Sequence, residues 1–406
     1  MMEPKYTIIE VLQGEWWIGA LAFGVALVLT PVVRLIAYHT NVVDRPDELL
    51  KPHGRPIAYL GGVAMLIGLL AGLAAMAAVI PDRAVVWSDA KRHLAAGELS
   101  LLLDNPLWNL LGIALGSTVM ACIGLLDDLF NIRPLQKIAG QVVAAGILLA
   151  GGIGHHMALF VLRPLGLGDV LWLGVPMSII MFLGAMVCAS NATNLLDGLD
   201  GLCGGVTGII ALGFLAIGAW LAAWGGRPGL DELRVGVCLA MAGAVLGFLP
   251  YNIPPASIFM GDAGSMLLGG YVATMMAMFC VSGNARWFAA ACMVFALPIL
   301  DTSLAVVRRF RAGTNIFAGD RSHLYDQLVD RGMSVKQVVV LFYALATATA
   351  AIGVGGAIFL RLRYALPLYA ILLILAWIAF LKLGMISPPP RGGPDTATPG
   401  DDVMKP

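Results

Sequence analysis

The chain has 406 residues, of which 59% are hydrophobic and 12% are charged, and its formal net charge at pH 7 is zero. An ordinary soluble protein carries about 25% charged residues, so this composition excludes a soluble fold and predicts an integral membrane protein. A zero net charge gives no general attraction to polyanions, and we expect no nucleic-acid partner.

Apolar runs of about 18 to 24 residues follow one another along the chain, the length that a helix needs to cross a hydrocarbon core of about 30 Å. They predict an all-α polytopic fold with about eleven membrane-spanning helices. The predicted spans are residues 16–38, 57–80, 106–126, 137–154, 172–190, 203–224, 235–251, 265–282, 286–306, 337–359 and 364–383. This membrane domain, 1–386, precedes a tail rich in Pro, Gly and Asp, 387–406, that we expect to be disordered.

The polar motifs fall in alternate connections, which places them on one face of the membrane. They follow the first, third, fifth, seventh and ninth spans, and an odd number of spans puts the two termini on opposite sides. Lys and Arg are modestly more frequent on the motif-bearing face, and most tryptophans map to the other face. The positive-inside rule therefore predicts that the motif face is cytoplasmic in the cell (inner) membrane, with the N-terminus outside.

The third span runs directly into an acidic pair, Asp127 and Asp128, in GLLDDLFNIRPLQK. Successive residues of a helix do not share a face, so we expect the two carboxylates to have different environments and different tasks. A plain polar helix end is the alternative for such a pair on its own. Lys137 follows where the chain re-enters the membrane, a position at which a lone lysine is usually a snorkelling anchor.

The fifth span ends in NATNLLDGLDGL, whose Asn191, Asn194, Asp197 and Asp200 follow one another at steps of three. On a helix the first three lie on one drifting side, and the neighbouring glycines let backbone come close to a ligand. A helix cap followed by a glycine break would explain one of these polar residues, but not all four.

FMGDAGS places Asp262 at the start of the eighth span, where helix N-terminal amides favour an anion and a carboxylate can bind a hard cation. An ordinary helix cap is the alternative. The connections that carry Asp197, Asp200 and Asp262 contain no Lys or Arg. Oxygen ligands without basic partners predict Mg²⁺ or Mn²⁺, held by one or two carboxylates and by substrate phosphates.

The last motif-side connection, 308–336, is strongly basic and also contains His323. Its arginines are Arg308, Arg309, Arg311, Arg321 and Arg331. Guanidinium groups bind phosphate oxygens in pairs, so this connection suits a diphosphate substrate. A role restricted to membrane topology is the alternative.

Together these segments, from about Asp44 to Gly332, resemble the polyprenyl-phosphate N-acetylhexosamine-1-phosphate transferase superfamily, which includes the phospho-MurNAc-pentapeptide translocase. Five ordered motifs carry the resemblance. VDRPDELLKPHGRPIAYLGG matches the first loop, DDLFN followed by Lys137 matches the acidic motif, and NATNLLDGLDGL and FMGDAGS match the two central motifs. The fifth motif departs from the family, because His-x-His-His is replaced here by His323, Leu324, Tyr325 and Asp326.

The resemblance implies transfer of a sugar 1-phosphate from a UDP-sugar donor to undecaprenyl phosphate, with release of UMP, at a cytoplasmic site. GDRSHLYDQLVDRG favours GlcNAc over MurNAc-pentapeptide, and a homodimer is left open. The implied metal ligands for Mg²⁺ or Mn²⁺ are Asn194 and Asp262, and the implied catalytic residues are Asp127, Asp128 and His323. The implied substrate-binding residues are Lys51, His53, Asn131, Lys137, Asn191, Asp197, Asp200, Asn252, Phe259, Gly261 and Arg321.

Two rival interpretations make different demands on the sequence. A secondary transporter also carries carboxylates in broken membrane helices, but it predicts ionisable residues near mid-span and two similar halves, and neither is evident. A CDP-alcohol phosphotransferase needs Ala-Arg shortly after Asp-Gly, and Asp197 and Gly198 lack that continuation. Direct attack by the lipid phosphate and a covalent intermediate on Asp127 or Asp128 both stay open.

Overall fold

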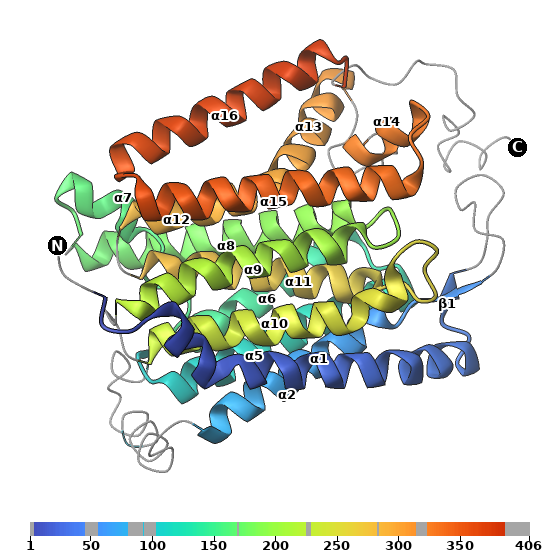
Figure 1. Ribbon diagram of the computed structural model, residues 1–406, viewed down its shortest axis with the longest axis horizontal. Coiled ribbons are helices and arrows are strands. Elements are labelled where there is room, and N and C mark those ends of the chain that lie inside the picture. Colours follow the sequence, from blue (N-terminus) through green and yellow to red (C-terminus); the bar gives the residue numbers. More distant parts are fainter. Residues whose placement is uncertain are drawn as a thin grey trace, which may run out of the picture.

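The computed structural model describes residues 4–44, 56–79, 92, 103–168, 170–224, 229–281, 284–313 and 323–385, so the predicted tail lies outside the described residues. The helices are α1 (Ile8–His39), α2 (Gly61–Val79), α5 (Pro106–Phe130), α6 (Pro134–Ala150), α7 (Leu159–Leu162), α8 (Leu171–Leu196), α9 (Leu202–Ala223), α10 (Leu230–Asn252), α11 (Gly261–Cys280), α12 (Ala285–Val294), α13 (Ala296–Ala312), α14 (Leu324–Asp330), α15 (Val335–Phe359) and α16 (Leu362–Lys382). Two short strands are β1 (Val43–Asp44) and β2 (Ile57–Ala58). The all-α polytopic prediction is confirmed (Figure 1).

Each of the eleven predicted spans contains helix, but not all of them pass as straight spans. Within the described ranges, nine helices are long and apolar enough to cross a membrane. α12 and α13 make a tenth span only as a pair, because the chain bends by 70° between them. α6 has 17 residues, about 26 Å at 1.5 Å per residue, which falls short of a hydrocarbon core of about 30 Å.

α11 lies at the centre of the bundle. Its most apolar 18-residue window is 100% buried, whereas the corresponding window of α16 is 11% buried. α11 packs mainly against α5 and α8, and it also contacts α2. α16 lies at the outer edge in Figure 1 and contacts α12, α13 and α15. Lipid would therefore surround α16 but not α11.

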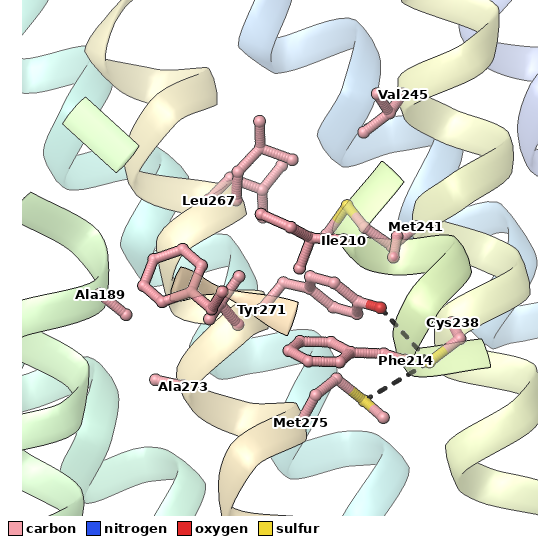
Figure 2. Close-up of a cluster of buried hydrophobic side chains, with 14 of the residues drawn as sticks. Ala189, Ile210, Phe214, Cys238, Met241, Val245, Leu267, Tyr271, Ala273 and Met275 are labelled. Atoms are coloured by element: carbon pink, nitrogen blue, oxygen red, sulfur yellow. Dashed lines mark hydrogen bonds between the residues drawn. The ribbon is translucent and has the colours of Figure 1, made fainter. Parts of the chain in front are cut away.

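Apolar side chains lock α11 against α9 and α10 (Figure 2). Phe214 of α9 lies beside Tyr271 of α11, with ring centroids 6.2 Å apart. The Tyr271 hydroxyl donates to Sγ of Cys238 in α10 at 3.3 Å, so its polar end is satisfied inside the core. This contact between three helices fixes α11 laterally, and with it the position of its N-terminus.

The polar motifs gather at one end of the bundle, on the right in Figure 1, where α1 ends beside β1 and where α14 lies. β1 and β2 are antiparallel, with Val43 opposite Ala58 and Asp44 opposite Ile57. The amide of Phe259 donates to the carbonyl oxygen of Ala58 at 2.8 Å. The connection that leads into α11 is therefore tied to the strands that flank the first predicted motif.

Candidate active site

Lys137, in the first turn of α6, is the centre of a polar cluster at this end of the bundle. Its Nζ donates to Asp127 Oδ2 at 2.8 Å, to Asn194 Oδ1 at 3.3 Å and to Asp262 Oδ2. The three acceptors belong to α5, α8 and α11. Three of the motifs predicted to form one site therefore meet on a single ammonium group.

Asn194 also joins α8 to α11 directly. Its Nδ2 donates to Asp262 Oδ1 at 2.7 Å and to Ser265 Oγ at 3.0 Å. The hydroxyl of the preceding Thr193 donates to the carbonyl oxygen of Ser265 at 2.8 Å. These contacts hold the amide oxygen of Asn194 and the carboxylate of Asp262 toward the same point.

Asp127 and Asp128 point to different partners, as their consecutive positions on a helix predict. Asp127 pairs with Lys137, whereas Asp128 accepts the main-chain amides of Asp262 at 2.8 Å and Ala263 at 3.1 Å. The first amides of a helix lack intrahelical acceptors and carry partial positive charge. Asp128 therefore caps α11 and fixes the residue that follows the cap.

Gly261 is required by this cap. Its φ of 68° lies in the left-handed region that glycine adopts without strain. A Cβ at this position would lie 2.5 Å from Asp128 Oδ2 and 2.9 Å from the carbonyl oxygen of Tyr59. A larger residue would displace the Asp128 carboxylate from the end of α11.

The connection between α8 and α9 carries Asp197, which lies close to several other acids. Burial, and then the negative charges of Asp262, Asp128 and Asp200, raise the pKa of Asp197 well above its usual value. The side chain therefore holds its proton more tightly than an exposed aspartate. A cation or a hydrogen-bond acceptor from a ligand would each change that balance.

Asp200 and Asn252, both predicted to bind substrate, are engaged with main-chain groups. Asp200 Oδ2 accepts the amide of Ala256 at 2.8 Å, and Asn252 Oδ1 accepts the amide of Gly201 at 3.1 Å. Asn252 also donates to the carbonyl oxygen of Ile258 at 3.0 Å. They tie the α8–α9 connection to the connection between α10 and α11.

Three further predicted residues lie around this cluster. Asn131 ends α5 with a φ of 50°, a left-handed conformation that asparagine tolerates better than most residues. Asn191 donates to Oε1 of the buried Gln141 at 3.3 Å. Phe259 is partly exposed, and its ring meets Tyr59 edge-on with centroids 6.0 Å apart. Lys51, His53 and Arg321 lie outside the described residues.

His323 is 3% exposed and begins α14. Its Nδ1 lies 2.8 Å from Asp301 Oδ2 of α13. Asp301 is not among the residues predicted from the sequence, although a carboxylate within an apolar run is typical of functional sites. The structure thus gives His323 a buried partner, and its catalytic role stays a prediction.

Two of the arginines predicted to clamp a diphosphate bind protein carbonyl groups at the end of α16. Arg308 donates to the carbonyl oxygen of Met385 at 3.3 Å, and Arg331 donates to that of Leu383 at 2.8 Å. Both carbonyl groups follow Lys382, the last residue of α16, and cationic side chains near a helix C-terminus complement its dipole. In this structure both arginines stabilise the position of α16.

A family model and several relatives match this chain. Glycosyl transferase family 4 matches residues 110–280, the stretch that contains the polar cluster. The chain is 32% identical over 360 residues to the decaprenyl-phosphate N-acetylglucosaminephosphotransferase of Mycobacterium tuberculosis, covering 85% of this chain and 83% of that relative. The chain belongs to the polyprenyl-phosphate N-acetylhexosamine-1-phosphate transferase family.

Two further relatives are named, one for the same sugar and one for a different group. A probable undecaprenyl-phosphate N-acetylglucosaminyl 1-phosphate transferase of Bacillus subtilis is 28% identical, covering 79% of this chain and 78% of the relative. A phospho-N-acetylmuramoyl-pentapeptide-transferase of Shouchella clausii is 29% identical, covering 84% of this chain and 97% of the relative.

Tyr59 lies beside the acidic cluster but is not among the site residues predicted from the sequence. Burial, and then the charges of Asp44, Asp128 and Asp262, raise the pKa of Tyr59, so its hydroxyl stays protonated beside the acidic cluster. It follows β2 within the first motif, PIAYLGG. The sequence feature that could have identified Tyr59 is a polar aromatic residue between this strand and two glycines.

The oxygen atoms of the cluster fit a divalent cation. Asp127, Asn194 and Asp262 direct three oxygens at the Lys137 ammonium, and two of them are carboxylates that share this one positive charge. Mg²⁺ and Mn²⁺ prefer such ligands, and substrate phosphates commonly complete their coordination. In the part of the chain that the structure describes, no group of three or more His, Cys, Asp or Glu side chains could hold a metal by itself. Two carboxylates and one amide oxygen would leave coordination positions of a bound ion open for water or for substrate phosphates.

Proposed function

We propose that the protein transfers a sugar 1-phosphate from a UDP-sugar to a polyprenyl phosphate in the membrane, which gives a polyprenyl-diphosphate sugar and UMP. The observation that carries the proposal is the meeting of Asp127, Asn194 and Asp262 on Lys137 at one end of a membrane bundle. Relatives named for decaprenyl- and undecaprenyl-phosphate GlcNAc transfer support the lipid acceptor and favour GlcNAc. UDP-MurNAc-pentapeptide is the alternative donor, because one relative is named for that group.

The reaction joins two anionic phosphate groups, so it needs charge neutralisation and positioning above all. The second pKa of a phosphate monoester is about 6, so the lipid phosphate is already largely a dianion at neutral pH. One of its oxygens attacks the phosphorus that carries the sugar. The bond from that phosphorus to the bridging oxygen breaks, and UMP leaves with the bridging oxygen and its electron pair.

Lys137 supplies positive charge where the phosphates would meet, and Asp127 holds its ammonium group in place. Asp128 fixes the N-terminus of α11 and therefore the position of Asp262. Both oxygens of Asp128 already accept main-chain amides, which favours direct attack over a covalent intermediate on this residue. A covalent intermediate on Asp127 remains the rival to direct attack.

We further propose that Asn194 and Asp262 hold Mg²⁺ or Mn²⁺ together with the donor diphosphate. The bound ion would supply neutralisation of the charge that develops on the departing UMP. The modest excess of Lys and Arg on the motif-bearing face, with the C-terminal residues included, supports a cytoplasmic site with the N-terminus outside.

The test is an assay of the purified protein with UDP-GlcNAc, UDP-MurNAc-pentapeptide and other UDP-HexNAc donors, each with undecaprenyl phosphate. We expect release of UMP and formation of the lipid-linked sugar with UDP-GlcNAc, loss of both with EDTA, and recovery with Mg²⁺. Release of many UMP molecules per enzyme without the lipid acceptor would indicate a hydrolase, and no release with any donor would refute the proposal. A glycophosphorylated Asp127 peptide, trapped without the acceptor, would refute direct attack.

A further inference from the structure

Two tyrosine hydroxyls hold the ends of the connection between α8 and α9. Tyr325 of α14 donates to the carbonyl oxygen of Leu195 at 3.0 Å, and Tyr343 of α15 donates to that of Gly201 at 2.6 Å. The last carbonyl groups of a helix have no intrahelical donor. Tyr325 therefore satisfies one of these groups at the end of α8, directly beside Asn194.

The ring of Tyr325 has little freedom to move. Tyr325 is 5% exposed, and its ring stacks parallel on His323 with centroids 5.5 Å apart and an interplanar angle of 7°. Phe342 meets the same ring edge-on at 6.5 Å. A Cβ on Gly198 would lie 2.5 Å from Cε2 of Tyr325, so the connection that carries Asp197 rests directly on this ring.

Asp301 ties this stack to α13. Its Oδ2 lies 2.8 Å from His323 Nδ1, and its Oδ1 accepts the amide of Leu324 at 2.8 Å. Asp301 is 1% exposed, so both contacts are shielded from water. A continuous line of contacts therefore runs from α13 through Asp301, His323 and Tyr325 to the end of α8.

We infer that Asp301, His323 and Tyr325 form a positioning unit that sets the end of α8, and with it Asn194 and Asp197, for the donor diphosphate. This inference rests on the proposed function and deepens it. Tyr325 stands where the family pattern has a histidine, and its hydroxyl reaches the Leu195 carbonyl group. In this role the unit acts through the main chain of α8.

The test compares two variants that lose the same kind of bond. Tyr325→Phe keeps the ring against His323 and Gly198 and removes only the hydroxyl. The control is Tyr369→Phe, because Tyr369 of α16 is 4% exposed and its hydroxyl donates to the carbonyl oxygen of Gly353 in α15 at 2.9 Å. Both variants should fold, with similar small losses in thermal midpoint.

Hydrogen–deuterium exchange of the amides in residues 195–201 tests the unit without any substrate. We expect faster exchange there in Tyr325→Phe, and also in Asp301→Asn, but not in Tyr369→Phe. Equal exchange in Tyr325→Phe and the control would overturn the inference. This measurement stands even if the wild-type protein releases no UMP, a result that would refute the proposed function alone.

Steady-state kinetics test the consequence for the donor. We expect Tyr325→Phe to lower kcat/KM for the UDP-sugar about fivefold, the effect of one net hydrogen bond. KM for the lipid phosphate should not change, and Tyr369→Phe should change neither value. A purely structural role would lower stability in both variants while kcat/KM for the donor stayed equal, and that result would overturn the positioning role.

Discussion

The two ends of the bundle differ in how their charged side chains are paired. At the far end, Asp231 and Arg234 of α10 pair at 2.7 Å one turn apart, with side chains only 7% and 2% exposed. Arg234 also donates to the carbonyl oxygen of Met278 in α11. At the motif end, Asp127 and Asp262 share the single ammonium group of Lys137.

The comparison distinguishes charged groups that stabilise the fold from charged groups that are available to bind a ligand. A buried carboxylate paired with a buried guanidinium has its charge balanced inside the protein. Two ionised carboxylates that share one ammonium group leave negative charge that this group does not balance, which is typical of functional sites. Changes at the motif end should therefore reduce activity more than stability, and changes at the far end should do the reverse.

The largest expected effect is that of Asp262→Ala. This change removes a partner of both Lys137 and Asn194, and we expect turnover to fall about 10³-fold or more because the proposed metal ion loses a carboxylate ligand and Lys137 loses a contact that positions it. The thermal midpoint should stay close to that of the wild type. Asp104→Ala, an exposed aspartate at the far end, is the control. Retained turnover in Asp262→Ala would remove this residue from the site.

Lys137→Gln should have the next largest effect. We expect turnover to fall about 10²-fold, because the phosphates lose a positive charge at the point of reaction. Binding of Mn²⁺ without substrate, followed by electron paramagnetic resonance, should become tighter, since the ammonium no longer competes for Asp127 and Asp262. Lys336→Gln, an exposed lysine at the start of α15, is the control. Weaker Mn²⁺ binding would contradict the shared-charge interpretation.

Asp231→Ala tests the far end. Loss of the carboxylate leaves the buried guanidinium of Arg234 without this counter-charge, which typically costs about 3–5 kcal/mol of stability. We expect a clearly lower thermal midpoint in detergent, with turnover per folded molecule unchanged. The adjacent Glu232 is exposed, so Glu232→Gln should cost far less. Equal stabilities of the two variants would show that the buried pair contributes nothing.

The smallest expected effect concerns pH. Because burial raises the pKa of Asp197 in the folded protein, the unfolded chain releases this proton at a lower pH than the folded one. Stability from this group is complete at low pH and is lost as pH rises through the folded pKa, by at most about 1.4 kcal/mol per pH unit. The thermal midpoint of Asp197→Asn should therefore exceed that of the wild type by a margin that grows as the pH rises above about 4. A constant margin would contradict this account.

Much of the fold follows from local features of the sequence. The lengths of the apolar runs predict the nine long spans of the described residues, because crossing a membrane fixes helix length more tightly than packing in water does, but they predict neither the bend between α12 and α13 nor the shortness of α6. The alternation of polar connections predicts that the motifs share one end of the bundle. The 100° step between helical residues predicts that Asp127 and Asp128 diverge.

The partners of these residues depend on packing between distant segments. Lys137 by itself resembles a snorkelling anchor, and its contact with Asp262 spans 125 residues of chain. The arginine-rich connection suggests a phosphate clamp, but Arg308 and Arg331 donate to carbonyl groups of the segment that directly follows α16. The partner of Asp301 is apparent only in the folded structure, where α13 and α14 meet. Spacing along the chain does not contain that information.

The burial of α11 has a consequence for how the protein is made. Among the nine candidate spans it has the lowest mean hydropathy, and it carries Asp262 in its first turn. A segment of this kind gains less than its neighbours from entering lipid alone. We expect its insertion to depend on α5 and α8 being in the bilayer already. The helix at the centre of the site would then insert into a cavity formed by protein rather than into lipid.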